Sequence, residues 1–93
     1  MKINLQTLRF KASDDLNQFV EEKVGKLARF DDSIISAEVT LSEDGNRPDN
    51  KVCDIRLVVP GNDDFVKREA VSFEEAIAAC VDTLQKILTE KKR

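Results

Sequence analysis

Two segments of the chain have the hydrophobic spacing of amphipathic helices. Within residues 14–30, apolar side chains recur every three or four positions, and Ser13 followed by two aspartates supplies an N-cap and favourable charge. Ser72 and Glu75 have the S-x-x-E spacing of a capping box, and a second apolar stripe follows them as far as Leu88. We therefore expect one helix over residues 14–30 and another that begins directly after Ser72.

Four other segments alternate between apolar and polar residues, which is the pattern of strands with one exposed face. The segment between the second and third of them, residues 43–50, contains glycine, asparagine and proline among charged residues and is typical of a hairpin turn. The fourth segment has the weakest alternation. The predicted strands cover residues 1–11, 35–42, 53–59 and 65–71.

The order of these elements predicts an α+β fold, strand-helix-strand-strand-strand-helix. A helix between the first two strands implies a crossover that makes them parallel, whereas the later connections are short enough for antiparallel pairs. Each helix has one apolar stripe, and the sheet has one exposed face. Both helices are therefore expected to pack on the same face of a four-stranded sheet.

Length and composition agree with one globular domain over residues 1–93. Apolar residues make up 41% of the chain and charged residues 35%, enough for both a core and a soluble surface. The longest apolar run, residues 76–81, is far too short to cross a bilayer, and residues 1–10 have no export signal. We expect a cytoplasmic protein without a membrane partner, with residues 90–93 as a frayed tail.

The residues that usually carry catalysis or bind metals are scarce. The chain has no histidine and only three glycines, and its adjacent carboxylates at 31–32, 63–64 and 74–75 are pairs whose side chains diverge or face solvent. We predict no catalytic residue, no metal site, no cofactor and no small-molecule substrate. Cys53 and Cys80 each fall on an apolar stripe without a metal-binding or disulfide pattern, which indicates buried, reduced thiols.

Net charge argues weakly against nucleic acid, because the chain carries −3 at pH 7 and most nucleic-acid binders are basic. A local basic face can still bind phosphate while acids elsewhere set the total. The distribution is uneven, since residues 1–11 hold three cations and no acid. The positions of the cations on the two helices therefore matter more than their number.

Cations gather near the ends of both predicted helices. On a helical projection Lys23 falls close to the centre of the apolar stripe, and two more cations follow at i+3 and i+6 as a ridge. An ordinary structural explanation stays open: Lys23 can extend its stem over the core edge, and Glu22–Lys26 and Asp82–Lys86 have the spacing of helix ion pairs. The candidate phosphate-binding residues are Lys23, Lys26, Arg29, Lys86, Lys91, Lys92 and Arg93.

Four segments carry the order of elements: MKINLQTLRF, SDDLNQFVEEKVGKLARF, SAEVTL and SFEEAIAACVDTLQKIL. Through these segments, essentially the whole chain resembles the short form of the ribosome hibernation promoting factors. This is the sigma modulation protein family, which includes ribosome-associated inhibitor A. The resemblance implies a fold similar to a double-stranded-RNA-binding domain. It also implies a protein that binds the decoding channel of the small ribosomal subunit, blocks mRNA and tRNA, and inhibits translation in stationary phase or stress. We expect a monomer when the protein is free, and whether it silences single ribosomes or promotes ribosome dimers stays open.

The resemblance also implies roles for individual residues. Lys23 and Lys26 match lysines on the first helix of the family, and Lys86 matches a basic position that faces ribosomal RNA; Arg29 and the C-terminal cations match less closely. Such contacts position a protein on RNA without reading its sequence. The chain departs from the family at Thr83 and Glu90, where relatives often carry cations.

Two other functions stay open from the sequence. One is a protein-interaction module that uses an edge strand or the exposed face of the sheet. The other, less favoured, is a small hydrolase based on Asp63 and Asp64. The exposed-face residues proposed for the interaction module are Glu38, Thr40, Arg56 and Val58.

Overall fold

The computed structural model describes residues 1–43, 45–47 and 49–91, apart from the side chain of Lys91. Four strands and two helices follow one another in the predicted order, with a short 3-10 helix after the first helix. The elements are β1 Lys2–Thr7, α1 Asp14–Gly25, η1 Lys26–Arg29, β2 Ser36–Glu43, β3 Lys51–Val58, β4 Asp64–Ala70 and α2 Phe73–Lys91.

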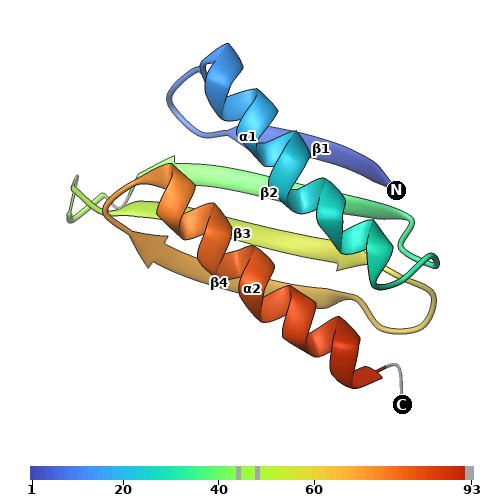
Figure 1. Cartoon of the computed structure of the whole chain (residues 1–93). Helices are drawn as coiled ribbons and strands as arrows, with labels where there is room; N and C mark the ends of the chain where they lie inside the picture. Colours follow the sequence, from blue (N-terminus) through green and yellow to red (C-terminus); the bar gives the residue numbers. More distant parts are fainter. Residues whose placement is uncertain (44, 48, 92–93) are drawn as a thin grey trace.

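The strands form one mixed sheet in the order β1-β2-β3-β4 (Figure 1). β1 is parallel to β2, with Ile3 beside Ala37. The other two pairs are antiparallel, with Val39 opposite Ile55 and Ile55 opposite Val66. The predicted topology is therefore confirmed: α1 connects the parallel pair, and loops connect the antiparallel pairs.

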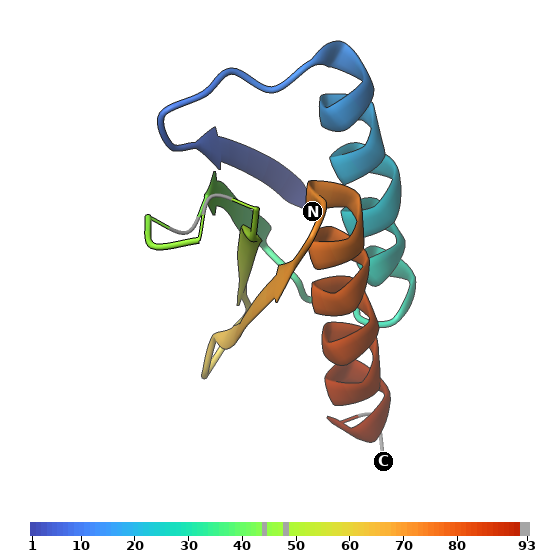
Figure 2. The ribbon, with the colours of Figure 1, turned by 90° about the vertical axis from the view of Figure 1, so that its left-hand side faces the viewer.

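Both helices lie on one face of the sheet, as their apolar stripes predict. Figure 2 shows the sheet and the helices as two layers. α1 packs against β1 and α2 packs against β3 and β4, and the two helices contact each other. The core lies between the layers, and its largest fully buried residues are Leu27, Leu41, Ile55, Leu57, Ile77, Leu84 and Leu88.

Serine side chains cap the N-termini of both helices, as predicted. Ser13 Oγ accepts a hydrogen bond from the Leu16 N–H at 3.1 Å, and Ser72 Oγ accepts one from the Glu75 N–H at 3.2 Å. Each cap satisfies a backbone donor that has no partner inside its helix. Two acidic residues follow each cap in the first turn, where they suit the helix dipole.

The first helix ends earlier than the sequence predicts. The α-helical conformation stops at Gly25, and residues 26–29 form a 3-10 turn in which the Phe30 N–H donates to the Leu27 carbonyl at 3.0 Å. Glycine is a weak helix former, and the last turn of a helix often tightens in this way. The prediction of one regular helix over residues 14–30 is wrong for this last turn.

The first strand is also shorter than predicted. β1 ends at Thr7, and Arg9 has a φ of 69°, which turns the chain away from the sheet. Thr7 Oγ1 donates to the Phe10 carbonyl at 2.7 Å, and the Phe10 ring stacks on Phe73 with centroids 4.8 Å apart. The predicted strand over residues 1–11 therefore includes a turn. The other three strands agree with prediction to within two residues.

Cys53 and Cys80 are free thiols in the core, as predicted. The Cys80 thiol donates to the Cys53 carbonyl at 3.2 Å. The pKa of the Cys53 thiol is raised by its interaction with the Cys80 thiol and by burial. The Cys53 thiol is therefore held in its protonated, unreactive form.

Neither a membrane-spanning helix nor a metal-binding cluster is found among the residues that the structure describes. No helix among them combines the length and hydropathy needed to span a bilayer. Nor do three or more His, Cys, Asp or Glu side chains gather there in a way that suits a metal ion. The adjacent carboxylates Asp63 and Asp64 lie at the start of β4, and Asp63 is exposed.

Candidate nucleic-acid interface

α1 and α2 run in similar directions, so their C-terminal ends lie at the same end of the molecule (Figures 1 and 2). Lys23 lies in the last turn of α1, and Lys26 and Arg29 lie on η1 directly after it. Lys86 and the backbone of Lys91 belong to the C-terminal part of α2. The structure thus places these predicted residues on neighbouring helix ends, where positive charge also suits the helix dipoles.

The tail is described only in part. α2 is helical through Lys91 and so includes Glu90, although residues 90–93 are predicted to fray. Lys92 and Arg93 lie outside the described residues.

Lys23 lies at the edge of the buried stripe of α1, not at its centre as predicted. The buried residues of the helix are Leu16, Val20 and Val24, whereas Phe19 and Lys23 share a flank and are only half-buried. Lys23 Nζ lies 5.6 Å from the centroid of the Phe19 ring, within the range of a cation–π contact. The ring therefore restricts the ammonium group while leaving it near the surface.

Lys26 and Arg29 are both exposed on η1. In a 3-10 helix, side chains at i and i+3 lie one above the other, with a rise of about 6 Å between them. In the predicted α-helix the same two side chains would diverge by about 60°. The 3-10 turn therefore points both cations in nearly the same direction, whereas a regular helix would keep them as neighbours at an angle.

The alternative in which acids on the same helices neutralise these cations is not what the structure shows. In the described part of the chain, neither Lys26 nor Lys86 forms an ion pair with the acid four residues before it. Glu22 Oε1 instead accepts from Gln18 Nε2 at 3.2 Å. The positive charges of Lys26 and Lys86 are therefore available to a partner.

Lys86 is exposed beside a shallow hollow on α2 of about 260 Å³. Gln85, Thr89 and Glu90 complete the lining of this hollow. The Thr89 hydroxyl donates back to the Gln85 carbonyl at 2.8 Å. Glu90 brings a negative charge next to Lys86, which reduces the local positive potential on this part of α2.

Sequence reasoning missed one exposed cation that contacts α2, Arg68 on β4. Its register partner is the buried Cys53, which faces the helices, and the Arg68 guanidinium reaches Thr83 on α2. The available signal was the alternation of Val66, Arg68 and Ala70, which places the three side chains on one face of the strand. The weak pattern of β4 concealed that this face is the one that α2 covers.

The opposite face of the sheet carries both charges. Glu38, Thr40, Arg56 and Val58 lie there as predicted, with Glu38 and Arg56 as cross-strand neighbours. Hydrogen bonds from the side chains of Asn4 and then Ser36 lower the pKa of Glu38. Acidic and basic groups alternate here, so this face lacks the single sign of charge that attracts phosphate.

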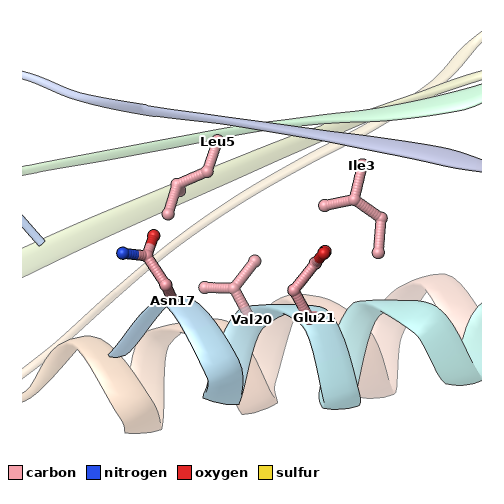
Figure 3. Close-up of a pocket in the computed structure, with 5 residues that line it drawn as sticks. All are labelled: Ile3, Leu5, Asn17, Val20 and Glu21. Carbon is pink, nitrogen blue, oxygen red and sulfur yellow. The ribbon is translucent and has the colours of Figure 1, made fainter. Parts of the chain in front are cut away.

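A groove of about 310 Å³ lies between β1 and α1. In Figure 3, Ile3 and Leu5 of β1 face Asn17, Val20 and Glu21 of α1 across it. The lining is mostly apolar, and its one charged residue is acidic. This groove is therefore unsuited to phosphate, unlike the ends of the helices.

Fold and surface together define a class of protein: a small α+β domain whose paired helices present exposed cations at one end. Such a surface suits a polyanion, because each neutralised phosphate releases counterions. A family model described as "Sigma 54 modulation protein / S30EA ribosomal protein" matches residues 3–93. The chain belongs to this family, which confirms the resemblance seen in the sequence. No curated protein sequence matches at a significant level.

Two solved structures are similar over nearly their whole length. The crystal structure of the Thermus thermophilus Protein Y N-terminal domain has a TM-score of 0.85 and 27% identity, and the match covers 98% of this chain and 99% of that one. A ribosomal subunit interface protein from Coxiella burnetii has a TM-score of 0.88 and 17% identity, with coverage of 99% and 98%. At 17% identity the second likeness shows the fold alone. Both confirm the predicted fold class.

Proposed function

We propose that this protein is a cytoplasmic, non-enzymatic ribosome hibernation factor that binds the decoding channel of the small ribosomal subunit. Occupation of that channel excludes mRNA and tRNA and so inhibits translation. The observation that carries the proposal is the set of cations at one end of α1, η1 and α2, of which Lys23 is half-buried and Lys26, Arg29 and Lys86 are exposed, in a chain of a ribosome-associated family. The proposed contacts to ribosomal RNA are Lys23, Lys26, Arg29 and Lys86, extended by Lys91, Lys92 and Arg93.

The proposed mechanism is electrostatic and steric. Lysine and arginine bind RNA phosphates by charge-assisted hydrogen bonds, which fix the protein on RNA of suitable shape without reading bases. The net charge of −3 opposes any approach to RNA that does not present the cationic end first. Binding should therefore be orientated by the uneven charge distribution and should weaken steeply with salt.

Sedimentation with purified ribosomal particles tests the partner. We expect the protein to pellet with small subunits and intact ribosomes but not with large subunits. The double variant Lys23→Glu/Lys26→Glu should lose binding. A matched control, Lys11→Glu/Lys67→Glu, makes the same change in net charge on exposed residues outside the proposed interface and should bind normally. Circular dichroism checks that both variants fold.

Competition tests the proposed position. Prebound mRNA with tRNA should prevent sedimentation of the protein, and the protein should inhibit translation in a cell-free extract. Simultaneous binding of mRNA, tRNA and protein would contradict a site in the decoding channel. A complex that survives complete RNA digestion and contains no ribosomal protein would instead support an interaction module.

A further inference from the structure

The Arg68 side chain is exposed and is held in place by two hydrogen bonds, one to α2 and one to its own strand. Its Nη2 donates to Thr83 Oγ1 at 3.2 Å, and its Nη1 donates to the Lys67 carbonyl at 2.9 Å. The bond to Thr83 bridges the edge strand β4 to α2, and the bond to Lys67 ties the guanidinium to the backbone of β4. The guanidinium therefore has a defined position on the surface, although arginine side chains are usually among the most mobile.

Thr83 orients Arg68 without neutralising its charge. The Thr83 hydroxyl donates its proton to the Ala79 carbonyl at 3.0 Å, so its oxygen lone pairs are left to accept from Arg68. No acidic side chain in the described part of the chain forms an ion pair with Arg68. The positive charge of Arg68 is therefore both fixed and unneutralised.

The remaining donors of Arg68 suit a phosphate group. A guanidinium has five N–H donors, and two are used in the hydrogen bonds above, so three remain for a partner. Its planar fork matches the oxygens of a phosphate. Thr83 and Lys86 are three residues apart on α2, which places them about 5–6 Å apart on the same surface. Arg68 is therefore anchored to a residue of α2 that neighbours Lys86 on the helix surface.

We propose that Arg68, positioned by Thr83, forms a phosphate-binding site for RNA together with Lys86. The site extends the interface from the helix ends, along α2, onto β4. Arg68 supplies a positive charge beside Thr83, which is itself uncharged. The register places Arg68 in the row of Thr7, Leu41 and Cys53, toward the N-terminal ends of the helices, so the site lengthens the interface along α2. An RNA backbone fits such a site, because successive phosphates can contact Lys86 on α2 and Arg68 on β4. The inference rests on the proposed function, which supplies the RNA.

Binding of charge variants to purified small subunits tests the site. Arg68→Gln should weaken binding about tenfold, the loss expected for one charge-assisted contact, and should reduce the slope of log affinity against log salt by about one. Thr83→Val keeps the charge and should weaken binding about two- to threefold with an unchanged slope. Arg68→Lys should fall between Arg68→Gln and wild type, because it keeps the charge but loses the fork.

Lys67→Gln is the matched control, since it removes one charge from the same strand on the opposite face of the sheet. The double variant Arg68→Gln/Thr83→Val should bind no more weakly than Arg68→Gln, because Thr83 acts only through Arg68. If Arg68→Gln binds like Lys67→Gln while Lys23→Glu/Lys26→Glu loses binding, the Arg68 site is wrong and the proposed function stands. If the folded wild type fails to bind small subunits, the proposed function itself is wrong, and this inference falls with it.

Discussion

The contact between Lys23 and Phe19 makes a measurable prediction about how a binding residue is positioned. Lys23 Nζ lies 5.6 Å from the ring centroid, and both side chains are half-buried. At such a site a cation–π contact contributes about 0.5–1 kcal/mol. Phe19→Leu preserves most of the apolar volume and should cost less than about 1.5 kcal/mol by itself. Part of that cost should disappear when Lys23 no longer carries a charge.

A double-mutant cycle isolates this part. We would measure the free energy of unfolding in urea for wild type, Phe19→Leu, Lys23→Met and the double variant. The expected coupling energy is about 0.5–1 kcal/mol, equivalent to roughly 2–8 °C in melting temperature for a domain of this size. A control cycle with Lys26→Met should be additive, because Lys26 has no aromatic contact in the described part of the structure.

The same variants connect stability to binding. Phe19→Leu removes the ring that positions Lys23, so affinity for small subunits should fall about two- to threefold. The slope of log affinity against log salt should not change, because the variant keeps every charge. A coupling energy of zero in the first cycle would refute the contact. If the coupling energy between Phe19 and Lys23 were no larger than that between Phe19 and Lys26, the ring would not position the Lys23 ammonium group.

Two further predictions concern the fold around the interface. Ser13→Ala removes the N-cap of α1 and should lower the free energy of unfolding by about 1 kcal/mol in urea denaturation, whereas Ser42→Ala on the exposed sheet face should change it little. Asn4→Ala removes the largest cause of the lowered pKa of Glu38, so an NMR titration should show this pKa rising toward its ordinary value. Because the folded-state pKa of Glu38 is lowered, its contribution to stability is present above the unfolded-state pKa and is lost as pH falls through the folded-state value; Asn4→Ala should make that loss smaller.

The order and topology of the fold follow from local signals in the sequence. Ser13 and Ser72 mark helix starts, because a cap depends only on residues within one turn. Alternation in β2 and β3 predicts a hairpin for a similar reason, since the two segments are adjacent along the chain. The parallel pairing of β1 and β2 follows from the helix between them.

The features that sequence reasoning misplaced depend on tertiary contacts. The chain changes to a 3-10 turn at Lys26 while Leu27 stays fully buried, and helical periodicity alone does not show where such a change occurs. Lys23 moves to the stripe edge because α1 buries the side centred on Val20. Arg68 meets Thr83 only after β4 and α2 pack together, so no spacing in the sequence predicts their hydrogen bond.

The salt dependence of binding to small subunits tests the central claim most directly. Between roughly 50 and 400 mM salt, phosphate contacts from all seven proposed cations of α1, η1, α2 and the tail predict a slope of log affinity against log salt of about −5 to −6 for the wild type. Lys23→Glu/Lys26→Glu should show no binding even at the lowest salt, while Lys11→Glu/Lys67→Glu should match the wild type. A slope near zero, or binding retained by the Lys23→Glu/Lys26→Glu variant, would contradict an interface built from the cations of α1, η1 and α2.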